Sequence, residues 1–371
     1  MSELFVGLMS GTSLDGVDGV LADISGTRLA VLAYGSAPLS QALTEELLAL
    51  NSPGPNELHR AALAANALVR VYAHLVANLL DQAGIKHTEV NAIGAHGQTV
   101  RHQPQAFDGT GYTLQLNNPA LLAELTGIEV VADFRSRDVA AGGQGAPLVP
   151  AFHQSVFGRL GETVATLNIG GISNLTVLGP KMTDDVLGFD CGPGNALMDA
   201  WCRQHLGQAF DADGTWAAAG RVHVDLLAAL LEEPYFDQPA PKSTGRDLFN
   251  PIWLARKLER FTSVAPVDVQ ATLTELTASA CAVCVKRYGF ESKNLIVCGG
   301  GAFNTHLMNR LQAHLPSLQV DSSQAHGLHP LQVEAAAFAW LARKTVRRET
   351  SSLEAVTGAQ GARVLGGIYP A

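Results

Sequence analysis

The same order of elements occurs twice along the chain, and this repetition strongly restricts the folds it can adopt. Residues 4–22 form an apolar strand, a turn rich in Gly, Ser and Thr, and a second strand. Residues 163–178 repeat this pattern with Gly, Ser and Asn at the tip. Each half then contains a helix, a glycine and a buried strand that ends at residues 95–98 or 298–301. We therefore expect two related α/β lobes, each opening on a β-hairpin, with a cleft between them.

A chain of 371 residues is long for one hydrophobic core, which also favours two domains. We predict a first lobe over residues 1–135, to which residues 345–371 cross back, and a second lobe over residues 136–344. The polar, Gly-rich segment 133–150 has two interpretations that remain open. It carries function, since it contains two acids and two arginines near a glycine cluster, or it is a hinge between the lobes.

The first hairpin turn combines donors with carboxylates. Ser10, Thr12 and Ser13 supply hydroxyl groups, and Asp15 and Asp18 supply carboxylates that suit hydrated Mg²⁺. Such a turn suits phosphate together with a metal. An ordinary hairpin turn uses the same residue types, so this stretch alone does not decide between the two interpretations.

The glycine-rich turns of the second half extend the phosphate interpretation. Residues 170–174 offer further donors, and residues 299–301 let phosphate or a flat ring lie against the backbone. The chain has neither the P-loop pattern nor a dinucleotide-binding fingerprint after its first strand. It also lacks the nucleophile elbow of the α/β-hydrolases.

A phosphoryl transferase needs a group that takes a proton from the nucleophile. Asp190 is the leading candidate because it ends a strand and precedes the glycines of a helix start, although an isolated Asp there is often only a helix cap. Glu334 begins an apolar helix, and spacing alone favours a solvated side chain for it. The competing acids are Asp15, Asp18, Asp133, Asp138 and Asp199.

Composition and charge restrict the classes of partner that the protein is expected to bind. The net charge is −9 and no basic cluster interleaved with aromatics occurs, which makes nucleic acid an unexpected partner. We expect no signal peptide, because no basic segment followed by an apolar segment begins the sequence. We expect no membrane span, because no uninterrupted apolar run of about 18 residues occurs. An odd count of five cysteines fits a reducing cytoplasm. Cys281 and Cys284 lie in an apolar helical run, which is more typical of a helix core than of a zinc site.

Together these motifs resemble the 1,6-anhydro-N-acetylmuramic acid kinase family over essentially the whole chain and in colinear order. The resemblance is carried by residues 7–18, 95–99, 133–150, 168–174, 189–195, 298–304 and 333–339. It implies an actin/hexokinase-type fold of two ribonuclease H-like lobes with ATP in the cleft. It also implies a cytoplasmic, homodimeric enzyme of peptidoglycan recycling that uses ATP, Mg²⁺ and water to open the anhydro ring and phosphorylate O6.

The resemblance also assigns residues. Asp190 corresponds to the catalytic aspartate, and Glu334 aligns with an acid expected to bind the sugar. We also expect Arg135, Asp138 and Gln98 to bind the sugar, and the carboxylates of Asp15 and Asp18 to be metal ligands. The expected ATP-binding residues are Gly11, Thr12, Ser13, Leu14, Asp15, Gly16, Val17, Asp18, Gly170, Gly171, Ser173, Asn174, Gly300, Gly301 and Asn304. One departure is Cys191, which stands beside the catalytic acid where the family usually has threonine.

Two rival functions fit the same lobes. One is a kinase of this fold acting on an ordinary sugar or a carboxylic acid. The other is an actin-like or chaperone-like ATPase, against which stands the lack of an appended polypeptide-binding domain, linker or long exposed apolar segment. ATP turnover that depends on the anhydro sugar would distinguish the three.

Overall fold

The computed structural model describes residues 2–371 except 12–13, 15, 27–28, 182–185 and 246–247. It divides into two compact units: Met1–Val156 with Leu331–Ala371 form unit 1, and Phe157–Pro330 form unit 2. The division differs from the boundaries expected after residues 135 and 344, because α4 (Ser136–Ala140) and α12 (Val333–Val346) pack within unit 1.

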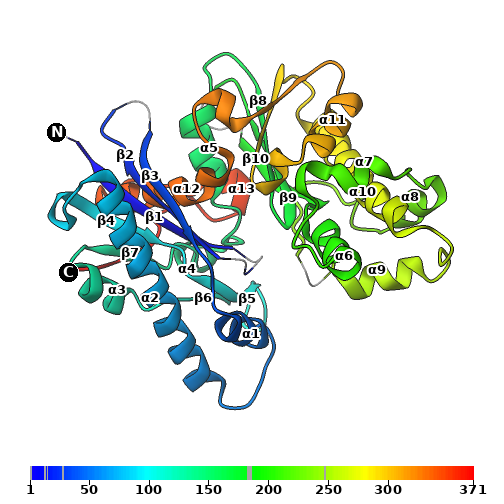
Figure 1. Ribbon diagram of the computed structural model, residues 1–371. Coiled ribbons are helices and arrows are strands. Elements are labelled where there is room, and N and C mark those ends of the chain that lie inside the picture. Colours follow the sequence, from blue (N-terminus) through cyan, green and yellow to red (C-terminus); the bar gives the residue numbers. More distant parts are fainter. Residues whose placement is uncertain (1, 12–13, 15, 27–28, 182–185, 246–247) are drawn as a thin grey trace. The chain divides into compact units, whose positions relative to one another are not determined.

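Unit 1 is built on a six-stranded sheet with the order β13-β7-β4-β1-β2-β3 (Figure 1). Neighbours among β1, β2 and β3 pair antiparallel, whereas β4 pairs parallel with β1 and with β7. Its strands are β1 (Leu4–Ser10), β2 (Val17–Asp23), β3 (Ala30–Ala37), β4 (Val90–Ala95), β7 (Val130–Ala132) and β13 (Gly367–Tyr369). The opening hairpin is therefore the β1–β2 pair, as the sequence predicts.

Helices cover both faces of this sheet. Gly19 of β2 lies against Leu75 of α2 (Glu57–Ala83), and Gly7 of β1 lies against α12. Since Gly19 pairs with Leu8 and successive residues of a strand face opposite ways, α2 and α12 lie on opposite faces. The remaining elements are α1 (Gln41–Ala49), β5 (Gln98–Pro104), β6 (Gly111–Leu116), α3 (Pro119–Thr126), α5 (Val149–Phe157) and α13 (Glu354–Thr357).

The long helix α2 qualifies as a membrane span by length and composition alone, which the sequence expectation of no such span did not foresee. Half of its most apolar stretch is buried, and Leu68, Tyr72 and Leu75 pack in the core of unit 1. A buried core helix meets the same criteria as a membrane span. Gly84 ends α2 in the left-handed conformation, at a φ of 66°.

Two paired glycines let α12 lie directly on the sheet. A Cβ on Gly7 would lie 1.9 Å from the carbonyl oxygen of Ala335, and one on Gly94 would lie 2.1 Å from that of Phe338. Gly7 and Gly94 stand opposite each other in β1 and β4. Gly7 therefore permits close packing of the helix, and this packing sets the position of Glu334 in the first turn of α12.

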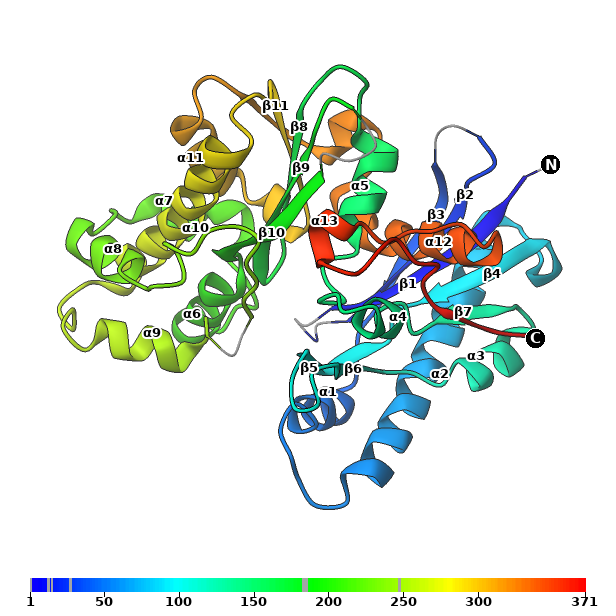
Figure 2. The same cartoon turned by 180° about the vertical axis from the view of Figure 1, so that it is seen from behind.

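Unit 2 repeats the plan of unit 1. Its five-stranded sheet has the order β10-β9-β8-β11-β12, with antiparallel β8–β9–β10 and parallel β8–β11–β12 (Figure 2). The strands are β8 (Val164–Ile169), β9 (Ile172–Leu178), β10 (Val186–Pro193), β11 (Asn294–Cys298) and β12 (Gln319–Ser322). The same strand order in both units confirms the predicted class of two related α/β lobes that each open on a hairpin.

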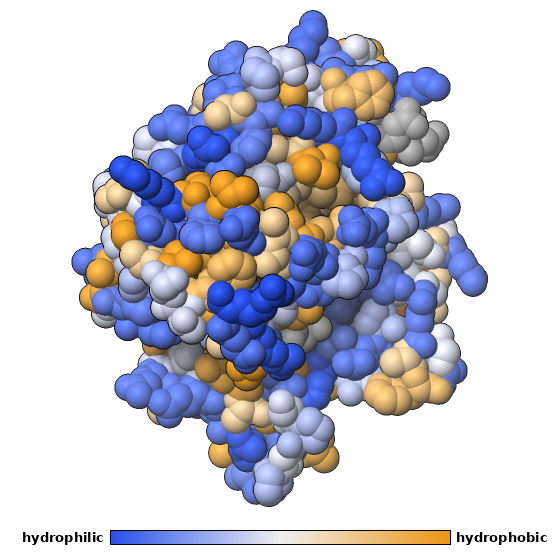
Figure 3. Space-filling model, turned by 90° about the vertical axis from the view of Figure 1, so that its right-hand side faces the viewer, coloured by the Kyte–Doolittle hydropathy of each residue, from blue (hydrophilic) through white to orange (hydrophobic). Residues whose placement is uncertain are grey.

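The core of unit 2 forms around α10 (Pro266–Tyr288), whose residues are buried on nearly every side. Cys281 and Cys284 of this helix and Cys191 of β10 all lie in that core, as the periodicity of α10 predicts. The other helices of the unit are α6 (Ala196–Leu206), α7 (Thr215–Ala219), α8 (Val224–Leu231), α9 (Pro251–Leu258) and α11 (Thr305–His314). On the face shown in Figure 3, hydrophilic and apolar side chains are interspersed, as on most globular proteins.

Candidate active site

Three turns meet at one edge of the unit 2 sheet, where β8, β10 and β11 end. The backbone N–H of Asn195 donates to the Gly170 carbonyl at 2.8 Å, and that of Gly194 donates to the Gly171 carbonyl at 2.9 Å. The Asn195 side-chain amide donates to the Ile169 carbonyl at 3.1 Å. Ligands of open α/β sheets bind at the carboxyl ends of the strands, which is this edge.

The hydrogen bonds of the β8–β9 turn orient its peptide groups. The carbonyl and N–H of a trans peptide point in opposite directions. Because the carbonyls of Gly170 and Gly171 point toward the start of α6, the N–H groups of Gly171 and Ile172 point to the opposite side. The turn therefore directs its carbonyl oxygens, which would repel phosphate, away from the side that presents two consecutive donors.

The glycine turns fit closely against one another. A Cβ on Gly194 would lie 2.3 Å from the carbonyl oxygen of Gly170. Gly299 has a φ of 78°, and its Cβ would lie 2.4 Å from Oδ1 of Asn168. Gly301 is buried against Ile169, whereas Gly300 is exposed. Among Gly299, Gly300 and Gly301, Gly300 thus presents the most open backbone, because Gly299 is partly exposed and Gly301 is buried.

Other predicted nucleotide residues of unit 2 have structural partners. The Ser173 hydroxyl is buried and donates to the carbonyls of Gly192 and Pro193 at 3.2 and 3.1 Å, so it braces the turn from inside. Oδ1 of Asn304 accepts from the Leu307 N–H at 2.9 Å and caps α11. Asn174 pairs with Asn168 on one side and Asp190 on the other, which places the three polar side chains in a row on one face.

Asp190 stands near the end of β10, next to a register shift between Asp190 and Gly192. Its Oδ2 accepts the Ser243 hydroxyl at 2.8 Å and the Thr244 N–H at 3.0 Å. Its backbone carbonyl accepts the Tyr235 hydroxyl at 2.7 Å, and its N–H donates to the Lys242 carbonyl at 3.0 Å. Burial raises the pKa of Asp190. This effect outweighs the hydrogen bonds that Ser243 and Thr244 donate to Oδ2, which lower the pKa. A carboxylate with a raised pKa is a stronger base than an ordinary aspartate.

The partners of Asp190 come from a segment that the sequence analysis did not select as part of the site. Ser243 and Thr244 lie 53 and 54 residues from Asp190, so no local pattern connects them. The available signal is the run of Pro, Lys, Ser, Thr and Gly at residues 241–245, a donor-rich turn comparable to the hairpin tips.

The hairpin of unit 1 is anchored in apolar core. Leu14 has a φ of 56°, which is rare for a bulky residue, and its buried side chain packs with Leu43 and Leu47. Its N–H donates to the Gly11 carbonyl at 3.2 Å. The buried side chains of Leu14 and Val17 leave only backbone for a ligand at these positions.

Among the remaining predicted residues of this hairpin, the structure describes Asp18 and Gly16. Asp18 accepts the Tyr34 hydroxyl at 2.8 Å, which orients its carboxylate. Gly16 lies against the carbonyl of Ala37, where a Cβ would approach to 2.8 Å. Thr12, Ser13 and Asp15 lie outside the described residues.

Polar side chains follow the parallel strands of unit 1 where β4 and β7 end. Arg135, after β7, donates to Nε2 of His96, after β4, through Nε at 3.1 Å and Nη2 at 2.9 Å. Its Nη1 donates to the Gly145 carbonyl at 2.9 Å. Burial and the Arg135 charge lower the pKa of His96 to about 3, so His96 is neutral and accepts. Burial lowers the pKa of Arg135 to about 10, against the charges of Glu334 and Asp138, so Arg135 is cationic at neutral pH.

The two other predicted sugar-binding residues are buried. The Asp138 carboxylate accepts the Gly145 N–H at 2.7 Å and the Thr357 hydroxyl at 2.8 Å. Gln98 accepts a hydrogen bond from the Ser10 hydroxyl at the end of β1. Arg135 and Glu334 are partly exposed, whereas Asp138 and Gln98 are 0% and 2% exposed. Sequence reasoning quoted His96 within a motif but did not select it, because its role depends on Arg135, 39 residues away.

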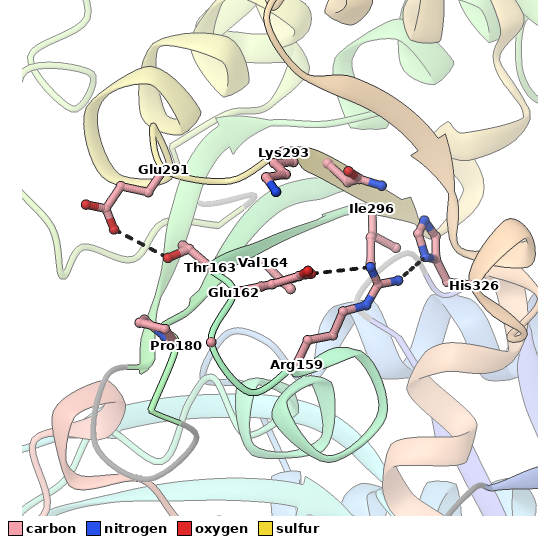
Figure 4. A pocket seen from close by; sticks show the side chains of 11 residues that line it. Arg159, Glu162, Thr163, Val164, Pro180, Glu291, Lys293, Ile296 and His326 are labelled. Carbon is pink, nitrogen blue, oxygen red and sulfur yellow. Dashed lines mark hydrogen bonds and ion pairs between the residues drawn. The ribbon is translucent and has the colours of Figure 1, made fainter.

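A separate cavity of about 270 Å³ lies at the opposite edge of the unit 2 sheet, where β8 and β11 begin (Figure 4). Arg159 faces Glu162 at 3.6 Å and His326 at 3.4 Å across this cavity. No predicted site residue lines it. Among the residues that the structure describes, no three His, Cys, Asp or Glu side chains gather as a metal site. Mg²⁺ often binds through one or two carboxylates, water and substrate phosphate, so such a cluster is not required.

The chain is similar to known proteins over essentially its whole length. The sequence profile described as anhydro-N-acetylmuramic acid kinase matches residues 3–371. A protein of that name from Albidiferax ferrireducens is 76% identical over 389 residues, covering 100% of both chains. Another from Variovorax paradoxus is 66% identical, over 100% of this chain and 99% of the relative. A solved activator of the 2-hydroxyisocaproyl-CoA dehydratase from Clostridium difficile has a TM-score of 0.48 at 12% identity, over 95% of this chain and 99% of that one. The profile match and the relatives establish that the chain belongs to the anhydro-N-acetylmuramic acid kinase family.

Proposed function

We propose that this chain uses ATP and water to open 1,6-anhydro-N-acetylmuramic acid and phosphorylate it in peptidoglycan recycling. Water adds its oxygen to C1 as the C1–O6 bond breaks, and Asp190 takes one proton from that water. The released O6 attacks the γ-phosphorus of ATP, giving N-acetylmuramic acid 6-phosphate and ADP. The observation that carries this proposal is the Asp190 carboxylate, which has a raised pKa and is held at Oδ2 by two donors.

One carboxylate suffices in this scheme. A glycosidase needs a second group to protonate the leaving oxygen. Here O6 forms a bond to phosphorus, and its developing charge is consumed by phosphoryl transfer. Asp190 therefore acts only as the base.

The turns of unit 2 are the proposed phosphate contacts. The N–H groups of Gly171 and Ile172 point away from the start of α6 and would stabilise charge on the transferred phosphoryl group. Gly300 offers exposed backbone beside them for the rest of the nucleotide. Ser173, Gly301 and Asn304 hold these turns in shape, Asn174 stands opposite Asp190 in the β9–β10 pairing, and Gly170 directs its carbonyl toward α6.

The hairpin of unit 1 is the second proposed nucleotide element, with contacts from its backbone between Gly11 and Asp18. Asp18, oriented by the Tyr34 hydroxyl, would be a ligand of Mg²⁺ together with Asp15. Bound there with the nucleotide, the ion would neutralise phosphate charge.

Arg135 and Glu334 are the proposed sugar contacts, because both are partly exposed and charged. Arg135 is held by His96, which receives two of its N–H groups. Asp138 and Gln98 are proposed to position the surrounding backbone, because both are buried and bonded within the protein. This refines the expectation that all four residues touch the sugar.

We further propose a cytoplasmic homodimer that binds neither nucleic acid nor membrane. The five cysteines are all free and buried, which fits a reducing compartment, and the net charge of −9 disfavours nucleic acid. The family resemblance supports the dimer, and light scattering of the purified protein tests it.

The decisive experiment incubates the protein with the anhydro sugar, ATP and Mg²⁺ in ¹⁸O-labelled water. We expect a phosphorylated sugar with ¹⁸O at C1, and no turnover from Asp190→Asn although it still binds ATP. More than a few per cent of activity in Asp190→Asn would place the base elsewhere. Phosphorylation of ordinary sugars alone, or ATP turnover stimulated by peptide or self-assembly, would support the rival functions.

A further inference from the structure

We propose that residues 235–244 are a positioning clamp that fixes Oδ2 of Asp190 and leaves Oδ1 as the atom that receives the proton. Ser243 and Thr244 are its working residues, and neither is expected to touch the reacting atoms. This inference rests on the proposed function, because it concerns how the same base is held.

The clamp binds Asp190 at four points. Two are on the side chain, where the Ser243 hydroxyl and the Thr244 N–H reach Oδ2 at 2.8 and 3.0 Å. Two are on the backbone, where the Tyr235 hydroxyl reaches the Asp190 carbonyl at 2.7 Å and the Lys242 carbonyl receives the Asp190 N–H at 3.0 Å. A carboxylate bound at one oxygen and through its own peptide groups has little freedom to rotate.

Residues within the clamp also bind one another. The Lys242 ammonium donates to the carbonyls of Tyr235 and Phe236 at 3.0 and 3.1 Å, and it lies 4.5 Å from the centre of the Tyr235 ring. Phe236 also packs on the irregular part of β10, where a Cβ on Gly192 would approach its ring to 2.7 Å. The segment therefore fits the strand at the register shift that follows Asp190.

The two oxygens of Asp190 consequently differ. Among the residues that the structure describes, none donates to Oδ1, whereas Oδ2 has two donors. A proton taken from water therefore goes to Oδ1, and Oδ2 stays bound to the clamp throughout. The same two donors lower the pKa of Asp190, against the burial that raises it. Ser243 thus influences both the orientation and the basicity of the carboxylate.

Several other titratable groups lie around Asp190. Burial and the Asp190 charge raise the pKa of Tyr235, so this phenol stays neutral. Lys242 from the clamp contributes a positive charge. From the core side, Cys191 and Cys284 interact with each other, and a hydrogen bond from Cys191 lowers the pKa of Cys284. A Cys284→Ser variant therefore belongs in the test, to show which group an observed pH limb reports.

The test is the pH profile of kcat for wild type, Ser243→Ala, Ser243→Thr and Thr244→Ala. Removing the Ser243 hydroxyl removes a donor to the ionised carboxylate, so the acid limb of Ser243→Ala should move up by about one pH unit, with a fall of about tenfold or more in the plateau kcat. Ser243→Thr restores a hydroxyl and should return the limb toward wild type. Thr244→Ala retains the backbone donor and should leave the position of the limb unchanged.

Because Ser243 is exposed, its truncation should not unfold the protein, and circular dichroism verifies this. An equal loss of kcat at all pH values in Ser243→Ala, without movement of the limb, would overturn the clamp. So would a limb that moves equally in Cys284→Ser. If Asp190→Asn is inactive in these cases, the proposed function stands. If Asp190→Asn remains active, the proposed function itself fails.

Discussion

Replacing Gly7 with alanine probes the contact that places α12 and its Glu334. A Cβ at Gly7 would lie 1.9 Å from the Ala335 carbonyl oxygen and 2.6 Å from the Ala339 nitrogen. Both obstacles are backbone atoms, so no side-chain rotation relieves the clash. Bringing the first contact to 3.0 Å requires that β1 and α12 separate by about 1.1 Å, since 3.0 minus 1.9 is 1.1.

A separation of this size disrupts a closely packed layer of small side chains that includes Ala335, Ala336 and Ala339. Overpacking costs about 1–3 kcal/mol, and a backbone obstacle places Gly7→Ala at the upper end, about 3 kcal/mol. For a unit of this size we expect the melting temperature to fall by about 6–12 °C. The KM for the sugar should also rise, because Glu334 moves with the first turn of α12.

The assay is thermal unfolding followed by circular dichroism, with Gly367→Ala as the matched control. Gly367 lies in β13 of the same sheet, and a Cβ there would meet only the Tyr369 ring at 3.9 Å. The control should change the melting temperature by no more than about 2 °C, as for an unstrained surface change. If Gly7→Ala melts within 2 °C of wild type, the packing of α12 on β1 gives way without cost, and the reasoning is refuted.

Three further predictions follow from the sites. In wild type, kcat should fall as pH drops through the raised pKa of Asp190, because the base is active only when ionised; a pH–rate profile that stays flat down to pH 4 would contradict this. Arg135→Lys keeps the charge but loses the three hydrogen bonds to His96 and Gly145, so steady-state kinetics should show a sugar KM about tenfold to a hundredfold higher and a nearly unchanged ATP KM. Leu14→Ala should cost about 2–5 kcal/mol in unfolding free energy and raise the ATP KM, whereas Leu14→Met, of similar volume, should change both less; equal effects of the two variants would show that packing at Leu14 does not hold the turn.

The sequence predicts the fold well because the information on each element is local. The hairpin pattern at residues 4–22 and the order of helix, glycine and buried strand before residues 95–98 are set by neighbours within a few residues, and these elements occur where they are expected. The domain boundary is less predictable, because it depends on which sheet α4 and α12 pack against. The glycines that decide the position of α12 are distant from it in the sequence: Gly7 lies 328 residues before Ala335, and Gly94 lies 244 residues before Phe338.

The candidate site also depends on contacts between residues that are distant in the sequence. The position of Asp190 at a strand end is visible locally, but its partners Ser243 and Thr244 come from a distant loop. Arg135 and His96 are likewise distant in the sequence. The sheet brings them together, because they follow the neighbouring parallel strands β7 and β4. Residue type alone also gives a wrong prediction when a polar side chain is bonded inside the protein. The hydroxyl of Ser173 suits phosphate, yet it is buried and donates to two carbonyls of its own unit.

The two units share a strand order, but their carboxyl edges carry different chemistry. In unit 2, β8 and β11 end in the glycine turns at residues 170–171 and 299–301, which offer backbone donors. In unit 1, β4 and β7 end in His96 and Arg135, which offer side chains of fixed charge and orientation. Backbone donors suit phosphate, which every ATP molecule presents in the same form, whereas side chains can match the arrangement of groups on one sugar. This difference supports our proposal that the glycine turns of unit 2 contact phosphate and that the residues after β4 and β7 of unit 1 contact the sugar.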